Sequence, residues 1–256
     1  MGKRSVGNGL VLLLGTIICG MFSIQVFADD KAHHKEEQHM KVWEIANGGI
    51  LYDDWAATLM ISLPDNTHPS YPSTGKQKGG LTWRCKECHG WDYMGKDGAY
   101  GKGSRHTGIK GINGMAGKPI DSIKNIVRGN THRYTKEMLP DKALEHIALF
   151  ISQGQVVMSN NIDAKTKAAK GDAKRGARFF QTICAICHGY DGKSINFQHD
   201  KHDAPEYIGT VAKDNPWEVL HKIRNGQPGV PMVALPVLDI QEQIDILTYA
   251  QTLPTK

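Results

Sequence analysis

The chain has 256 residues with 40% hydrophobic and 22% charged side chains, values that are ordinary for a soluble globular protein of one or two domains. Its formal net charge is +5, and loss of two basic residues with an N-terminal leader leaves 29 basic and 26 acidic residues, a balance that gives no reason to expect a nucleic-acid partner. Its five cysteines exclude a disulfide scaffold, because such scaffolds are short and dense in cysteine.

Residues 1–28 have the pattern of a secretory signal segment. Lys3 and Arg4 form a basic start, an apolar run from Leu10 to Phe22 follows, and Val26-Phe27-Ala28 offers a cleavage site. The alternative is an uncleaved anchor helix, since the apolar stretch nearly reaches the roughly 20 residues that span a bilayer. Either way we expect the rest of the chain to be periplasmic or otherwise extracytoplasmic, free or anchored to the membrane.

Residues 29–80 are expected to form an N-terminal extension that contains the first helix of domain one. That helix includes Gly48 to Tyr52, which resembles Gly176 to Phe180 in the second half. A long segment with three prolines then precedes Cys85. Loops of this length are usually functional or packed over a neighbouring element.

Residues 81–155 are expected to form domain one. The domain opens with a Cys-Lys-Glu-Cys-His pentad, and a helix from Ile120 to Val127 is followed by a loop that contains Met138. A closing helix from Lys142 to Ser152 presents apolar residues at helical spacing. Residues 156–170 are polar and rich in alanine and lysine, which is typical of a linker.

Residues 171–256 repeat this order of parts and are expected to form domain two. Asp172 caps a helix that runs to a Cys-Ala-Ile-Cys-His pentad. A second helix lies around Trp217 to Ile223, Met232 follows in a loop, and Ile240 to Leu253 is the closing amphipathic helix. The repeat predicts an all-α protein with two tandem domains of the same fold.

The two C-x-x-C-H pentads are the recognised signature of covalent haem attachment. Two thiols form thioethers with the haem vinyl groups, and the adjacent imidazole binds the iron. The chain is therefore expected to carry two haem c groups. The predicted attachment and proximal iron-binding residues are Cys85, Cys88, His89, Cys184, Cys187 and His188.

Two other interpretations of the cysteines are weaker. A thioredoxin-like redox pair requires a βαβ context, which the pattern does not contain. A zinc site built from all four cysteines would link two halves that each look self-contained. It would also leave the histidine after each pair unexplained.

Met138 and Met232 are the predicted distal iron ligands. Each follows a helix that ends in Arg and Gly and precedes a proline and the closing helix. A thioether on haem iron raises the reduction potential, which suits an electron carrier. In domain one His106 and His132 leave bis-histidine ligation open.

The remaining candidates have simpler expected roles. We expect the carbonyl of Pro205 to orient the proximal imidazole of domain two. Core packing is expected for four methionines, Met60, Met94, Met115 and Met158. Surface positions are expected for three histidines, His199, His202 and His221.

The sequence resembles the class I c-type cytochromes, and in particular two-domain diheme members of the cytochrome c4 type. Residues 171–192, GDAKRGARFFQTICAICHGYDG, look like the first helix and haem loop of that family. The resemblance covers about residues 81–155 and 171–254 and implies the attachment and ligand residues given above. The chain departs from the family in its N-terminal extension, the insert before Cys85 and the longer loop from Trp91 to Lys118, which favour a dedicated subunit or a partner-specific carrier.

The expected function is a one-electron relay between a respiratory donor and a terminal acceptor. The expected partners are redox proteins: a membrane quinol-oxidising complex, a dehydrogenase, or a terminal oxidase or reductase. The alternative is a haem enzyme or an enzyme subunit, like a thiosulfate dehydrogenase or a peroxidase, with catalysis at the first haem. Thiosulfate dehydrogenases use a distal cysteine, and no cysteine remains here outside the leader and the pentads.

Overall fold

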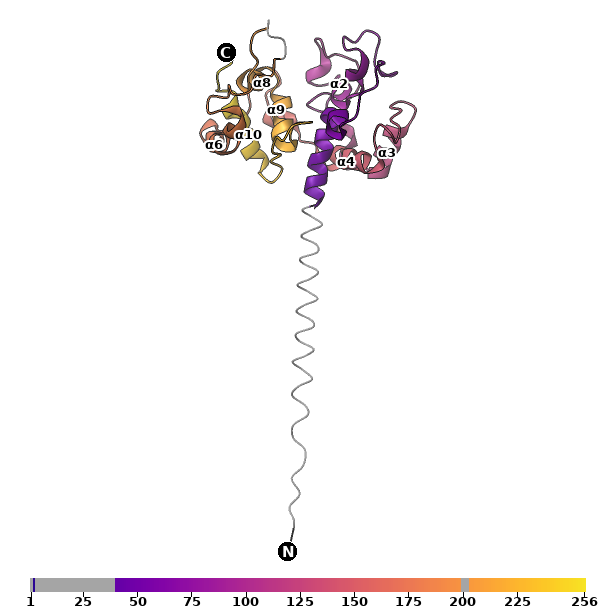
Figure 1. Ribbon diagram of the computed structural model, residues 1–256, viewed down its shortest axis with the longest axis horizontal. Coiled ribbons are helices and arrows are strands. Elements are labelled where there is room, and N and C mark those ends of the chain that lie inside the picture. Colours follow the sequence, from indigo (N-terminus) through magenta and orange to yellow (C-terminus); the bar gives the residue numbers. More distant parts are fainter. Residues whose placement is uncertain (1, 3–39, 199–202) are drawn as a thin grey trace. The chain divides into compact units, whose positions relative to one another are not determined.

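A computed structural model describes residues 2, 40–198 and 203–256 of the chain (Figure 1). Apart from residue 2, the predicted signal segment lies outside the described residues, as do His199 and His202. Residues 43–256 form one compact unit, and both halves of the predicted repeat lie in it. Within the described ranges, no helix is long and apolar enough to cross a membrane.

The described chain is mostly helical, as the sequence predicts. It contains no strand in the described ranges, only isolated bridges between Gly95 and Lys110 and between Ile162 and Ala169. The first half contains a helix over residues 40–59, η1 (Gly79–Trp83), α2 (Cys85–His89), η2 (Ala99–Gly101), η3 (Asn113–Met115), α3 (Ile120–Arg128), α4 (Asp141–Leu149), η4 (Phe150–Gly154) and α5 (Met158–Asn161). The second half contains α6 (Ala173–Phe179), η5 (Phe180–Cys184), α7 (Ala185–His188), α8 (Ile208–Asp214), α9 (Pro216–Asn225) and α10 (Ile240–Ala250).

Local signals account for the ends of the second-half helices. The Asp172 side chain accepts hydrogen bonds from the backbone of Lys174 at 2.8 Å and of Arg175 at 3.2 Å, which confirms it as the N-cap of α6. Pro216 occupies the first turn of α9, and Gly226 ends that helix with φ of 100°. The closing helix α10 ends at Ala250, three residues before the expected Leu253.

A glycine allows the closing helix of each half to approach an earlier helix closely. A Cβ at Gly48 would clash with the carbonyl oxygen of His146 in α4, and a Cβ at Gly176 would clash with that of Asp245 in α10. One turn further along, an aromatic pair completes each crossing. Tyr52 lies 5.4 Å from Phe150, and Phe180 lies 5.3 Å from Tyr249, between ring centroids.

The two crossings have the same register. Each glycine lies four residues before its aromatic residue, and the residue it contacts, His146 or Asp245, lies four residues before the aromatic partner. Figure 1 shows α6 and α10 together in the second half and α3 beside α4 in the first. The expected likeness of Gly48–Tyr52 to Gly176–Phe180 is therefore present in the packing. Division of residues 43–256 into two domains stays a prediction.

The segment predicted as a linker contains α5, and Met158 and Ile162 are buried, so it contributes to the core; its place between two domains stays a prediction. One expectation about packing is wrong. Met60, expected in the core, is 91% exposed because it lies in the turn that ends the helix of residues 40–59, with φ of 56°.

Candidate functional site

The first pentad forms the short helix α2, which ends at Gly90 with φ of 79° and ψ of 161°. Cys85 and Cys88 are unpaired thiols on this single turn. The phenol of Tyr52 donates a 2.6 Å hydrogen bond to the carbonyl of Gly90. The opening helix thereby fixes the point at which the chain leaves the pentad.

His89 is held in a single tautomer. Its Nδ1 lies 2.8 Å from the carbonyl oxygen of Lys110, which only accepts, so Nδ1 carries the proton and Nε2 carries the lone pair. Burial lowers the pKa of His89 to about 4, so the imidazole is neutral at neutral pH. A neutral imidazole oriented through its second nitrogen is the form that binds a metal.

The second pentad has nearly the same backbone geometry as the first. Cys184 closes η5, α7 carries the remaining residues, and Gly189 ends the turn with φ of 79° and ψ of 159°. Cys184 and Cys187 are unpaired thiols, like their counterparts in the first half. The same residue pattern thus produces the same local structure twice.

His188 differs from His89 in its hydrogen bonding. Its Nδ1 is buried and has no partner within the described part of the chain, so the expected hydrogen bond to the carbonyl of Pro205 is absent. The rings of Phe180 and Phe197 lie 6.4 and 6.1 Å from that of His188, between centroids. Burial lowers the pKa of His188, which favours the neutral, metal-binding form.

The environment of three of the cysteines disfavours the thiolate form. Burial raises the pKa of Cys85 and of Cys88 to about 12 and that of Cys184 to about 11, so the thiols are protonated at neutral pH. Over the ranges that the structure describes, no cluster of three or more His, Cys, Asp or Glu side chains is arranged to hold a metal ion. The four-cysteine zinc alternative is therefore not supported.

These donor sets fit a covalently attached haem. Each pentad offers two free thiols and a neutral histidine, and in the first the free nitrogen is Nε2. Such a group would be held by thioethers at Cys85, Cys88, Cys184 and Cys187 and by the imidazoles of His89 and His188.

Both predicted distal methionines lie in loops that precede the closing helices. Met138 is partly buried against the core, and its backbone N–H lies 3.4 Å from the hydroxyl of Thr135. Met232 is partly buried, and its backbone N–H bonds the carbonyl of Val230 at 2.8 Å. Their role as iron ligands stays a prediction.

His132 is the histidine that the structure brings to His89. The centroids of the two rings are 6.1 Å apart, and the ring planes are inclined by 33°. Nδ1 of His132 lies 3.1 Å from the carbonyl oxygen of Ile126. From the sequence alone, His132 was one of two histidines, with His106, that could replace Met138 as the distal ligand.

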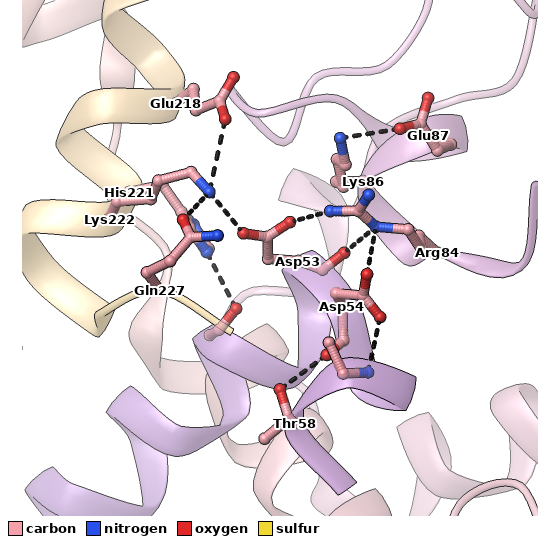
Figure 2. Close-up of polar contacts among 12 residues, drawn as sticks. Asp53, Asp54, Thr58, Arg84, Lys86, Glu87, Glu218, His221, Lys222 and Gln227 are labelled. Atoms are coloured by element: carbon pink, nitrogen blue, oxygen red, sulfur yellow. Dashed lines mark hydrogen bonds and ion pairs between the residues drawn. The ribbon is translucent and has the colours of Figure 1, made fainter. Parts of the chain in front are cut away.

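A buried charge cluster joins the first half to α9 (Figure 2). Asp53 is fully buried, and its carboxylate accepts hydrogen bonds from Arg84 at 2.5 Å and from Lys222 at 2.9 Å. Burial raises the pKa of Asp53, but these two cations outweigh that effect and the pKa lies below its ordinary value. The ammonium groups of Lys86 and Lys222 also lie over the ring of Trp91, at 4.8 and 5.2 Å from its centroid.

His221, also in α9, is fully buried next to this charge cluster, so its predicted surface position is wrong. Its Nε2–H donates to the carbonyl of Gly49 at 2.9 Å, and its Nδ1 accepts a 2.8 Å hydrogen bond from the phenol of Tyr93. A signal was available in the sequence, because Trp217, His221 and Asn225 share one face of a helix at four-residue spacing.

Two known groups of proteins are similar to parts of this chain. Residues 171–249, which include the second pentad and Met232, match the family described as cytochrome C oxidase, cbb3-type, subunit III. A protein of Synechocystis sp. (strain ATCC 27184 / PCC 6803 / Kazusa) described as cytochrome c-553-like is 34% identical over 87 residues. The match covers 34% of this chain and 73% of that protein.

Proposed function

Because this chain belongs to the cytochrome c family, we propose that it is a periplasmic diheme cytochrome that relays single electrons between a respiratory donor and a terminal acceptor. The observation that carries the diheme proposal is the repetition of one pentad geometry. Gly90 and Gly189 end the two turns with the same φ and with ψ values of 161° and 159°. The glycine crossings at Gly48 and Gly176 support two equivalent units around these pentads.

Each residue set has a definite role in this proposal. Cys85 and Cys88 in the first half, and Cys184 and Cys187 in the second, fix the porphyrin edge through thioethers. When bound, haem supplies a one-electron iron couple. Nε2 of His89 and the imidazole of His188 would bind the irons, and Met232 would supply the sulfur that raises the potential of the second site.

The surroundings of the first pentad limit reorganisation during electron transfer. Trp91 and Tyr93 are buried beside the pentad, and the hydroxyl of Tyr52 holds its exit turn. These side chains cover the chain on one side of the pentad, and the carbonyl of Lys110 keeps the imidazole of His89 in one orientation. A rigid, dry site is what an electron carrier requires, since charge enters and leaves without bond making.

The proposed partners follow from the family and from the predicted export. The matched family description names an oxidase subunit, which favours a terminal oxidase or reductase as acceptor. A membrane quinol-oxidising complex or a dehydrogenase is the proposed donor. Residues 1–28 would direct the chain to the periplasm and either be removed or anchor it to the membrane.

The haem count tests the diheme proposal. The chain is produced with its leader in a bacterium that matures c-type cytochromes, and alkaline pyridine spectra together with intact mass measure haem per chain. Wild type should carry two, while Cys85→Ser/Cys88→Ser and Cys184→Ser/Cys187→Ser should each carry one. A wild-type chain with a single haem would refute the diheme proposal.

Carbon monoxide distinguishes the relay from the alternative, a haem enzyme with catalysis at the first site. A relay with two closed irons binds no carbon monoxide when reduced, whereas a peroxidase-like or thiosulfate dehydrogenase-like enzyme needs an exchangeable position. Stoichiometric binding at one haem of the wild type would therefore favour the enzyme.

A further inference from the structure

The separation of the rings of His89 and His132 matches a shared metal ion. A metal lies roughly 2 Å from an imidazole nitrogen that binds it, so two imidazoles on opposite sides of one metal have centroids roughly 6 Å apart. The observed distance is 6.1 Å.

The two histidines also have the same tautomer, because each bonds a backbone carbonyl through Nδ1. Nδ1 of His132 donates to the carbonyl of Ile126 at 3.1 Å, as Nδ1 of His89 donates to that of Lys110 at 2.8 Å. A carbonyl oxygen only accepts, so both rings carry the lone pair on Nε2. A backbone carbonyl on the second nitrogen is the usual support of a metal-binding histidine.

Counted back from the closing helix, His132 lies close to the position that Met232 has in the second half. Met232 lies eight residues before Ile240, where α10 begins, and His132 lies nine residues before Asp141, where α4 begins. Met138 lies only three residues before Asp141.

Two residues of the insert before the first pentad, His68 and Ser70, form hydrogen bonds with the backbone at His132. Nε2–H of His68 donates to the carbonyl of His132 at 2.8 Å, and the hydroxyl of Ser70 donates to that of Thr131 at 2.6 Å. Nδ1 of His68 accepts a hydrogen bond from the backbone N–H of Ser70 at 3.1 Å, which fixes the tautomer of His68 with the proton on Nε2. His68 is buried, and its ring lies 4.3 Å from that of Trp83, between centroids.

We propose that His132, rather than Met138, is the second axial ligand of the first haem and that the insert containing His68 positions it. This inference rests on the proposed attachment of a haem to Cys85 and Cys88. A methionine ligand raises the potential of haem iron relative to a second histidine. The first site would therefore have the lower potential of the two, and electrons would pass downhill from the first half to the second.

Ligand spectroscopy of the fully oxidised, haem-loaded chain tests the proposal. Electron paramagnetic resonance and the near-infrared charge-transfer bands distinguish His/His from His/Met ligation. Wild type should show one haem of each kind. His132→Ala should remove the His/His signals and open one haem per chain to carbon monoxide on reduction. Met138→Ala and the histidine control His106→Ala should leave both the His/His and the His/Met signals unchanged.

A variant that supplies a different ligand at position 132 distinguishes loss of the ligand from misfolding of the chain. His132→Met should restore a six-coordinate first haem with His/Met signals and raise its midpoint potential. His68→Ala should give a mixture of ligation states at the first haem only, and His68→Gln, which retains a donor, should restore most of the His/His signal.

Three results would overturn the proposal: two His/Met haems in the wild type, loss of the first distal ligand in Met138→Ala, or unchanged signals in His132→Ala. The pyridine haem count separates these outcomes from failure of the proposed function. Two haems with the wrong ligands refute only the His132 assignment, whereas fewer than two refute the diheme proposal itself.

Discussion

The phenol of Tyr93 donates a 2.8 Å hydrogen bond to Nδ1 of His221, although 128 residues separate the two in the chain. Both side chains are buried, and each lies in a different half of the predicted repeat. His221 also donates to the carbonyl of Gly49, so one imidazole joins α9 to both the opening helix and the loop that follows the first pentad. The halves are thus joined by directional polar contacts as well as by apolar packing.

Removal of the phenol should weaken this junction. Tyr93→Phe leaves the buried Nδ1 of His221 with only a 3.4 Å contact to Asn225, so the free energy of unfolding should fall by about 1–3 kcal/mol. Urea unfolding followed by far-ultraviolet circular dichroism measures the change. Tyr190→Phe is the matched control, because Tyr190 is 76% exposed and should tolerate the change. Equal losses in the two variants would contradict this role of Tyr93.

His221 should also make stability depend on pH. Burial lowers its pKa from 6.5 to about 4 in the folded chain. Between these values the unfolded chain binds the additional proton, so the free energy of unfolding should fall as pH drops from about 6.5 to about 4, by at most roughly 3 kcal/mol. Urea midpoints at several pH values should show a shallower dependence in His221→Gln, and an identical dependence would contradict the assignment.

The Asp53 carboxylate should be the most sensitive part of the charge cluster. Asp53→Asn leaves the cations of Arg84 and Lys222 without their buried counter-charge, which should cost about 3 kcal/mol or more. Asp97→Asn removes an exposed partner of Lys96 and should change stability little, because exposed ion pairs contribute little. Thermal unfolding of the two variants compares them directly, and similar melting temperatures would show that the cluster is not a stabilising unit.

The glycines at the helix crossings should not tolerate a methyl group. Gly48→Ala and Gly176→Ala place a Cβ against a backbone carbonyl that cannot move aside, so each should lower the free energy of unfolding by about 1–3 kcal/mol. Gly114→Ala is the control, since a Cβ there meets open space and the backbone φ is not positive. A loss in the control as large as in the crossings would disprove the packing explanation.

The second half was largely predictable because its signals are local. Asp172 caps α6, Pro216 opens α9 and Gly226 ends it, all as expected from short-range chemistry. The pentads were equally clear, because two cysteines and a histidine at fixed spacing lie on one turn wherever that turn packs. The sequence also predicted that a long insert before Cys85 would be functional or would cover a neighbour, and His68 and Ser70 do contact the loop at His132.

Contacts between distant segments were not predictable. Asp53 and Lys222 look like ordinary exposed charges in their own helices, and only tertiary packing pairs them. The hydrogen bond from His89 to the carbonyl of Lys110 leaves no trace in the sequence, because every residue has a carbonyl. The expected Pro205 contact failed for the same reason: backbone acceptors are selected by the path of a loop rather than by residue type.

The second residue between the cysteines differs sharply in exposure between the two pentads. Glu87 is 3% exposed and Ile186 is 81% exposed, whereas the first residue, Lys86 or Ala185, is nearly buried in both, at 5% and 9%. Under the proposed attachment of two haems, we therefore expect the first pentad to be loaded before Glu87 is buried, whereas the second stays accessible for longer. Faster alkylation of Cys187 than of Cys85 in the folded haem-free chain would report this difference in access.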